Sequence, residues 1–275
     1  MKRLFIMFLF LIYSEFIYSK PILVGSYNTM RLGQNEKDLS AVAKIISKFD
    51  IVALQEVMNR EGLDRLKNEI EKKTGEKWGY VISEKPVGSK EYKEYYSFIY
   101  KKGSIDKIES LGLYQDGKSK DFIREPYAVY VKSNNFDFVL ITVHSIFGDS
   151  KSEREIEASR YHKVYKYFKD KSHEEDIILL GDFNLPANSH AFKYFKDEYK
   201  VKEVLNPNVD KTTISESRLA NSYDNIFFNR NKLREWTKRY GVYDYTKDNY
   251  KEIRKYVSDH LLIFIEFENG KDLDD

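Results

Sequence analysis

The sequence contains no cysteine among its 275 residues. This absence excludes disulfide frameworks, thiolate nucleophiles and zinc sites built on cysteine. Proline is scarce, with five residues in the chain, and no internal repeat or low-complexity linker interrupts the sequence. We therefore predict a single domain over residues 20–275.

An excess of charge of one sign is also absent, because 46 Lys and Arg residues are matched by 44 Asp and Glu residues. A protein that coats DNA through many phosphate contacts carries a strong basic excess, so that class is excluded. A nucleic-acid substrate held at a local basic rim remains compatible with this balance. The hydrophobic content of 41% is sufficient for a full core.

Long apolar runs are absent except at the N-terminus, where Leu4–Tyr13 follows Lys2 and Arg3. Ile17-Tyr18-Ser19 then offers a cleavage site of the secretory type. The run is shorter than the roughly 20 residues of a membrane span. We predict a signal peptide over residues 1–19, with an uncleaved anchor as the alternative. The mature chain would lack a transmembrane segment and be secreted, or stay at the cell surface or in the periplasm.

Apolar segments rich in Ile, Val, Phe and Tyr recur along the chain and predict β-strands. These segments are Ile22–Tyr27, Ile51–Leu54, Ser97–Tyr100, Tyr127–Val131, Phe136–Val143, Ile177–Leu180, Ile226–Phe228 and Leu261–Phe267. Apolar residues at helical spacing predict helices over Leu39–Phe49 and Tyr161–Phe168. Helices between strands indicate sheets covered by helices, and two sheets packed face to face would bury such apolar strands.

Polar groups stand where the predicted strands begin or end. They are Asn28, Gln55-Glu56, His144-Ser145, Gly181-Asp182-Phe183-Asn184, Tyr223-Asp224 and Ser258-Asp259-His260. If neighbouring strands run in suitable directions, all six groups gather at one rim. Hard oxygen ligands of this kind suit Mg²⁺ or Mn²⁺ better than zinc. Two histidines near carboxylates can act as general base and general acid, which phosphodiester hydrolysis requires. A single carboxylate after a strand is often only a turn former, so the prediction depends on the presence of all six polar groups in one chain.

Short motifs at these and other positions resemble the endonuclease/exonuclease/phosphatase superfamily, and within it the deoxyribonuclease I branch. The motifs are Ser26-Tyr27-Asn28, Leu54-Gln55-Glu56-Val57, Tyr92-Lys93-Glu94, Arg124-Glu125-Pro126, His144-Ser145, Gly181-Asp182-Phe183-Asn184, Tyr223-Asp224 and Ser258-Asp259-His260. The resemblance runs from about Ile22 to Phe267. It implies an α+β fold, a four-layer αββα sandwich in which helices flank two packed, mostly antiparallel sheets.

The resemblance also implies a role for each site residue. The implied metal ligands are Asn28, Glu56, Asp182, Asn184 and Asp259, with Glu56 as the principal ligand. The implied acid–base pairs are Glu94 with His144 and Asp224 with His260, and which histidine is the base stays open. The implied substrate contacts are Tyr92, Arg124, Asn184 and Thr213. Mg²⁺ is the expected ion, Mn²⁺ is the alternative, and Ca²⁺ is a candidate assisting ion.

Two departures from the deoxyribonuclease I pattern concern loops and arginines. The segment Gln115–Asp121 is shorter than in animal relatives and lacks cysteine, so we do not expect calcium bound at this loop. Met30 and Met58 stand where a phosphate-contacting arginine is common, and Arg31 and Arg60 are the candidates to compensate.

The sequence therefore predicts a secreted, metal-dependent endonuclease that hydrolyses DNA with little sequence preference. Water would attack phosphorus, the 3′ oxygen would leave, and 5′-phosphate ends would result. We expect a monomer with no stable protein partner. The alternatives are a phosphodiesterase of a lipid headgroup resembling bacterial sphingomyelinases, a toxin subunit of the cytolethal distending type, and an inactive secreted binding protein of the same fold.

Overall fold

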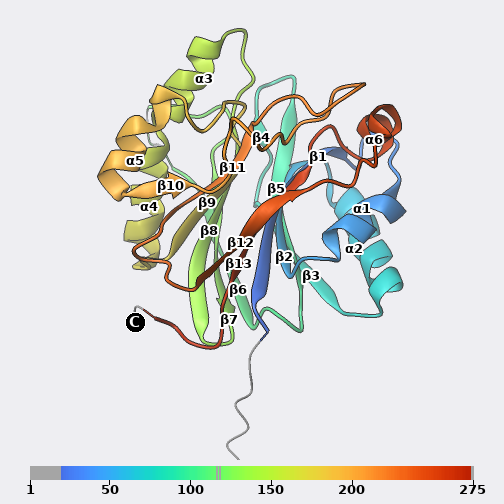
Figure 1. The fold of residues 1–275 in the computed structure, drawn as a ribbon, viewed down its shortest axis with the longest axis horizontal. Helices are drawn as coiled ribbons and strands as arrows, with labels where there is room; N and C mark the ends of the chain where they lie inside the picture. Colours follow the sequence, from blue (N-terminus) through green and yellow to red (C-terminus); the bar gives the residue numbers. More distant parts are fainter. Residues whose placement is uncertain (1–19, 116, 118, 274–275) are drawn as a thin grey trace, which may run out of the picture.

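The computed structural model describes residues 20–115, 117 and 119–273 (Figure 1). Two β-sheets lie face to face, and helices cover the outer face of each (Figure 1). The expected signal peptide, residues 1–19, lies outside the described residues. No described helix is both long enough and apolar enough to cross a bilayer.

The seven-stranded sheet has the order β12-β13-β1-β2-β5-β3, and β4 pairs with β5. Its strands are β1 (Ile22–Leu32), β2 (Ile51–Val57), β3 (Trp78–Ile82), β4 (Val87–Gly88), β5 (Lys93–Lys101), β12 (Trp236–Tyr243) and β13 (Leu262–Phe267). The six-stranded sheet has the order β10-β11-β9-β8-β7-β6. Its strands are β6 (Lys107–Leu113), β7 (Tyr127–Ser133), β8 (Phe136–His144), β9 (Ile177–Asp182), β10 (Val201–Glu203) and β11 (Asp224–Asn229).

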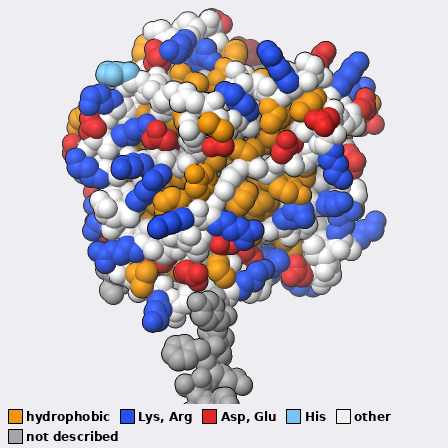
Figure 2. Space-filling view, viewed as in Figure 1, with side chains coloured by type: hydrophobic (Ala, Val, Ile, Leu, Met, Phe, Trp, Pro, Cys, Tyr) orange, Lys and Arg blue, Asp and Glu red, His pale blue; other side chains and the backbone are white. Residues whose placement is uncertain are grey.

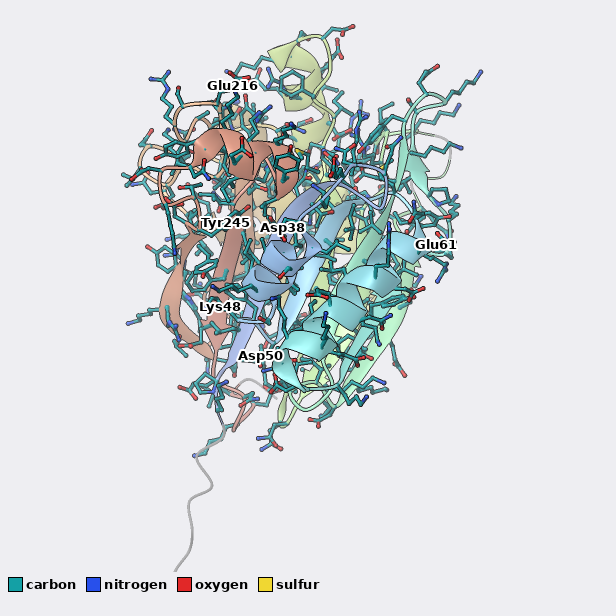
Figure 3. The ribbon with its side chains drawn as sticks, turned by 90° about the vertical axis from the view of Figure 1, so that its right-hand side faces the viewer. Asp38, Lys48, Asp50, Glu61, Glu216 and Tyr245 are labelled. Carbon is teal, nitrogen blue, oxygen red and sulfur yellow. The ribbon has the colours of Figure 1, made fainter. Side chains whose placement is uncertain are left out.

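The helices form the two outer layers. They are α1 (Leu39–Ile46), α2 (Arg60–Thr74), α3 (Lys151–Ala158), α4 (Tyr161–Ser172), the short 3-10 helix η1 (His190–Phe192), α5 (Lys193–Tyr199) and α6 (Tyr250–Tyr256). Figure 3 shows α1 and α2 side by side on the seven-stranded sheet, with Asp38 and Glu61 near their starts. Asp38 caps α1 by accepting a hydrogen bond from the Ala41 amide at 2.9 Å, which satisfies one of the free amides of the first turn.

Alternating side chains of the central strands enter different hydrophobic cores. On β9, Ile178 and Leu180 join a cluster that draws residues from both sheets, whereas Ile177 and Leu179 join a second cluster with the helices of the six-stranded side. A third cluster joins the seven-stranded sheet to α1 and α2. Because successive residues of a strand point to opposite faces, three cores between four layers follow directly. The predicted four-layer αββα sandwich is confirmed.

Mostly antiparallel pairing is also confirmed, and the two exceptions position the polar groups. The pairs β1·β2 and β8·β9 are parallel, so their C-terminal ends lie at the same rim. In this register His144 is opposite Asp182, and Asp182 is opposite Asp224 on antiparallel β11. Gln55 joins the sheets beneath that rim, because its Nε2 donates to the Thr142 hydroxyl at 2.8 Å.

Candidate active site

A pocket of about 810 Å³ opens at the rim where these strand ends meet. Of the predicted site residues, its lining contains Glu56, Tyr92, Arg124, His144, Asp182, Asn184, Thr213, Asp259 and His260. The remaining three, Asn28, Glu94 and Asp224, are fully buried and contact lining residues from behind. All of the predicted residues are therefore brought to one region of the molecule.

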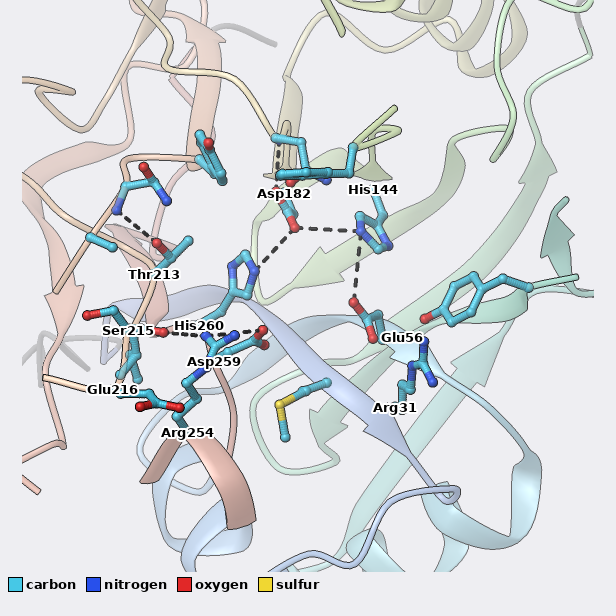
Figure 4. Close-up of a pocket in the computed structure, with 18 of the residues that line it drawn as sticks. Arg31, Glu56, His144, Asp182, Thr213, Ser215, Glu216, Arg254, Asp259 and His260 are labelled. Carbon is cyan, nitrogen blue, oxygen red and sulfur yellow. Dashed lines mark hydrogen bonds and ion pairs between the residues drawn. The ribbon is translucent and has the colours of Figure 1, made fainter. Parts of the chain in front are cut away.

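The Asp182 carboxylate occupies the centre of this pocket. His144 Nε2 lies 3.6 Å and His260 Nε2 lies 3.4 Å from Asp182 Oδ2, and the two rings approach from opposite sides (Figure 4). The preceding residue, Gly181, has a φ of +141°, and a Cβ there would lie 2.1 Å from the Val143 carbonyl oxygen. Glycine therefore lets β9 approach β8 closely where the aspartate enters the site.

The first histidine–carboxylate pair is His144 with Glu94. His144 Nδ1 lies 2.9 Å from both carboxylate oxygens of Glu94, so Nε2 is left to face the pocket. The His144 amide donates to the Tyr96 hydroxyl at 2.9 Å. Arg124 Nε lies 3.3 Å from Glu94 Oε2, which adds a cation beside this carboxylate.

The second pair is His260 with Asp224, whose nearest atoms, Nδ1 and Oδ2, lie 2.8 Å apart. The His260 amide donates to the Ser258 hydroxyl at 3.1 Å, and this hydroxyl donates to the Asn28 carbonyl at 2.7 Å. The Asp224 amide donates to the Thr212 hydroxyl at 3.0 Å. Both imidazoles are thus held through Nδ1 and the backbone, with Nε2 toward the pocket.

Charge and burial act against each other in both pairs. Burial alone would lower the pKa of His144, but the negative charge of Glu94 raises it above its usual value. Burial opposes charge on His260 in the same way, and Asp224 and Asp182 raise its pKa well above the usual range. Burial raises the pKa of Asp224, whereas for Asp182 the two imidazoles outweigh burial and lower the pKa.

Glu56 faces the pocket beside this centre. Its φ of +58° is uncommon for a residue other than glycine, and such strained backbone concentrates at functional sites. Asn28 Nδ2 lies 3.1 Å from Glu56 Oε1 and 3.2 Å from Asp182 Oδ2, so one amide bridges two carboxylates. The Asn28 side-chain oxygen accepts the Met30 amide at 2.9 Å. Direct ligation of a metal by Asn28 stays a prediction.

The donor set fits a hard divalent cation. Asp182, Asp224 and His260 place ligand atoms within 4.8 Å of one another. Asp259 Oδ1 is buried and has no hydrogen-bond partner within the described part of the chain, although Arg254 lies 3.5 Å from its other oxygen. Buried carboxylate oxygens of this kind are stabilised by a cation. The acidic groups of the pocket could therefore hold a metal ion, and its identity stays a prediction.

Two of the predicted substrate contacts, Tyr92 and Arg124, line the pocket together with Arg31. Two guanidinium groups lie near the Tyr92 ring, with Arg31 5.1 Å and Arg124 5.3 Å from its centroid. Arg31 therefore supplies a cation where Met30 replaces the expected arginine, whereas Arg60 is not among the residues lining the pocket. Two cations around an aromatic ring form a rim suited to phosphate and sugar.

Asn184 and Thr213 are held in place by local hydrogen bonds. The Asn184 amide donates to Asp182 Oδ1 at 2.9 Å, and its side chain donates to the Ser145 carbonyl at 2.8 Å. Thr213 forms an antiparallel bridge with His260, and its hydroxyl accepts the Asn221 amide at 2.8 Å. Both line the pocket, and their contacts with phosphate stay predictions.

Sequence reasoning missed Phe147, which lines the pocket, and Arg154, which packs against its ring. Phe147 lines the pocket with 61% of its surface exposed, and Arg154 lies 4.9 Å from its ring centroid. Arg154 also donates to the Asn184 carbonyl at 3.2 Å. The available signal was position, because Phe147 follows the His144-Ser145 motif by two residues.

Comparison with known proteins agrees with this geometry. Residues 25–260 match the Endonuclease/Exonuclease/phosphatase family. The chain belongs to this family. A protein of Thioalkalivibrio sp. (strain K90mix) named deoxyribonuclease is 32% identical over 271 residues, covering 90% of this chain and 71% of the relative. Deoxyribonuclease-1 of Sus scrofa is 27% identical, over 74% of this chain and 75% of its own. The resemblance to the deoxyribonuclease I branch is thus confirmed.

Solved structures support the fold. An endonuclease/exonuclease/phosphatase family protein from Leptotrichia buccalis C-1013-b has a TM-score of 0.64 at 16% identity, covering 90% of this chain and 99% of that one. The endonuclease domain of the retrotransposon TRAS1 has a TM-score of 0.56 at 14% identity, covering 92% and 100%. Family membership and the relatives named deoxyribonuclease make this chain a hydrolase that acts on phosphodiester bonds.

Proposed function

We propose that the chain is a metal-dependent endonuclease that hydrolyses DNA with little sequence preference and leaves 5′-phosphate ends. The observation that carries the proposal is the pair of imidazoles whose Nε2 atoms lie 3.6 Å and 3.4 Å from Asp182 Oδ2. A phosphate bound beside Asp182, within reach of both imidazoles, would have a proton acceptor on one side and a proton donor on the other, as hydrolysis requires.

Each pair has a defined task in this mechanism. Glu94 and Asp224 accept the Nδ1 protons of their histidines and hold the rings with Nε2 toward the phosphate. One Nε2 removes a proton from the attacking water, and the other protonates the departing 3′ oxygen. A divalent ion held by Glu56, Asp182, Asn184 and Asp259 would supply positive charge to the phosphate oxygens, with Mg²⁺ as the expected ion.

The surroundings of the pocket favour DNA over a lipid headgroup. Tyr92 with its two flanking arginines provides stacking and phosphate contacts at one side. On the other side, the loop bridged at Ile214 and Leu219 exposes Glu216, Ser217 and Arg218 at its tip. A loop that enters a lipid surface would instead carry apolar side chains. Contacts to phosphates and groove shape, without base-edge readout, give little sequence preference.

A direct test compares two substrates with the same purified protein. We expect supercoiled plasmid to be nicked in Mg²⁺ and sphingomyelin to remain intact. The nicked ends should accept label from a polynucleotide kinase only after phosphatase treatment, because they carry 5′-phosphates. Sphingomyelin hydrolysis without plasmid nicking would favour the lipid alternative, and direct kinase labelling would contradict the proposed bond cleavage.

The proposal includes export as a monomer. The leader pattern of residues 1–19 supports cleavage after Ser19, and Lys20 would then begin the mature chain. Mass spectrometry of protein recovered from the culture medium or periplasm tests this directly. Retention of Met1 in a membrane fraction would instead support an uncleaved anchor, and light scattering would reveal a stable oligomer.

A further inference from the structure

A second group of carboxylates lies at the end of the sandwich remote from the active site. Asp176, Glu235 and Asp272 each place a carboxylate oxygen within 4.8 Å of the other two. Asp176 directly precedes β9, and Asp182 is the last residue of that strand. Because a strand rises about 3.3 Å per residue, the six-residue separation places the two sites about 20 Å apart.

The three carboxylates come from three different parts of the fold. Asp176 precedes β9 of the six-stranded sheet, and Glu235 precedes β12 of the seven-stranded sheet. Asp272 belongs to the segment after β13, which runs along the lower edge of the sandwich (Figure 1). This segment is attached at Glu235, whose Oε1 accepts the Leu273 amide at 2.7 Å. The cluster therefore stands where both sheets meet the C-terminal segment.

Glu235 is buried in a way that calls for a counter-charge. Glu235 is 1% exposed, and its carboxylate oxygen Oε2 has no hydrogen-bond partner among the described residues. Within the same part of the chain, no Lys, Arg or His lies within ion-pair distance of this carboxylate. Asp176, in the same cluster, is also 1% exposed. Burying an ionised carboxylate such as that of Glu235 is costly unless a cation is coordinated or a proton is taken up.

We propose that Asp176, Glu235 and Asp272 form a structural Ca²⁺ site that fastens the C-terminal segment to both sheets. Oxygens bound to one Ca²⁺ ion at about 2.4 Å lie no more than about 4.8 Å apart, and the three carboxylates meet this limit. Ca²⁺ accepts oxygen ligands in flexible geometry and leaves positions for water, whereas Mg²⁺ demands a near-ideal octahedron. The site is separate from the catalytic pocket, so it does not depend on the proposed nuclease activity.

The competing explanation is a proton shared between two of the carboxylates. Thermal unfolding of the full protein in Ca²⁺ and in EDTA separates the two explanations. We expect Ca²⁺ at a hundredfold excess over its Kd to raise the Tm by about 5 to 10 °C, because it binds only the folded state. Glu235→Gln keeps an acceptor for the Leu273 amide but removes one charge, and it should lose most of this shift.

The matched control is Glu175→Gln, which changes an acid next to Asp176. Glu175 lies outside the cluster and pairs at the surface with Lys169 at 2.7 Å and Lys232 at 3.6 Å. This variant should keep the full Ca²⁺ shift. Should Glu235→Gln fail to fold, Asp272→Asn in the less buried C-terminal segment should give the same loss of the shift.

Calcium titration by calorimetry adds a count of sites. The parent protein should bind one Ca²⁺ more than Glu235→Gln, while plasmid nicking in Mg²⁺ should be equal for both at 25 °C. The readout is the difference in bound Ca²⁺ between the parent and Glu235→Gln. An ion bound near Glu56 would be counted in both proteins and would not change this difference. An unchanged Ca²⁺ shift and equal site counts in Glu235→Gln would overturn the proposal, as would a parent Tm that does not respond to Ca²⁺.

Discussion

The two histidine–carboxylate pairs lie on either side of Asp182 and are built alike at the backbone. A hydroxyl accepts the backbone amide of each histidine, supplied by Tyr96 for His144 and by Ser258 for His260. Each ring is also fixed through Nδ1 by a fully buried carboxylate. The shared construction leaves both Nε2 atoms facing the same position from opposite directions.

The pairs differ in what surrounds the carboxylate. Glu94 has the Arg124 guanidinium at 3.3 Å, and Arg124 also lies over the Tyr92 ring. Asp224 has a buried Oδ1 with no hydrogen-bond partner among the described residues. The Tyr92 and Arg124 side of the pocket therefore contacts the His144 pair directly. A change at Arg124 should therefore perturb the His144 pair more than the His260 pair.

Removal of either imidazole should have the largest effect. We expect His144→Ala and His260→Ala each to lower the rate of plasmid nicking by about 10²- to 10⁴-fold, the usual contribution of acid–base catalysis. Initial rates in Mg²⁺ measure this, with circular dichroism confirming that both variants are folded. Nicking at the parent rate by either folded variant would contradict its assigned role.

Arg124→Ala should have the next largest effect, because it removes the cation from one pair. Arg124 forms an ion pair with Glu94 at 3.3 Å, and breaking such a buried pair costs about 3 kcal/mol, which corresponds to a loss of kcat/KM of about a hundredfold. Thr212→Val is the matched change beside Asp224, and it should cost less because the Thr212 hydroxyl is uncharged. Equal losses of kcat/KM in Arg124→Ala and Thr212→Val would mean that the Arg124 cation gives the His144 pair no special dependence.

The Tyr96 and Ser258 hydroxyls, which accept the backbone amides of the two histidines, should affect the free energy of unfolding. Tyr96→Phe removes the acceptor of the His144 amide, and an unsatisfied buried amide costs about 1 to 3 kcal/mol. Ser258→Ala should cost more, because its hydroxyl both accepts from His260 and donates to the Asn28 carbonyl. Urea unfolding at constant m-value measures both. A larger loss for Tyr96→Phe would reverse the expected order.

Phe147→Ala should have the smallest effect. The ring lines the pocket with most of its surface exposed, so we expect it to contribute to substrate binding and not to the support of either pair. We expect KM for DNA to rise about threefold with kcat unchanged, as for an exposed aromatic contact. Steady-state kinetics on a short duplex, with Phe147→Tyr as the conservative control, would show whether kcat falls instead.

The sequence predicted the central strands well and the edges poorly. β9 and β2 are apolar on both faces because each face enters a core, and this pattern is visible without a structure. The unpredicted strands β3, β6, β10 and β12 are edge strands, and β4 pairs only with β5. The strands β6, β10 and β12 are partly exposed and contain polar residues, which hides their periodicity, whereas β3 is apolar but only five residues long. The helix α2 was missed because its apolar stripe is short, with Leu63, Leu66 and Ile70 buried.

The site followed the same division. Residues at the ends of buried strands, such as Asp182, could be found from pattern alone because parallel neighbours end at one rim. Glu94 came only from the family motif, because the predicted strand began at Ser97, whereas β5 begins at Lys93 and has Glu94 as its second residue. Tyr96 contributes through a contact made across the fold, because its hydroxyl accepts the His144 amide, and spacing along the chain does not reveal this contact.

The central claim is that residues scattered from Asn28 to His260 form one metal-dependent hydrolytic centre. Its most direct test is plasmid nicking by the parent protein and Glu56→Gln after EDTA treatment and restoration of Mg²⁺. The parent should lose activity in EDTA and regain it with Mg²⁺, whereas Glu56→Gln should stay inactive at the same Mg²⁺ concentration. Parent activity that persists in EDTA, or restored nicking by Glu56→Gln at the parent rate, would contradict the claim.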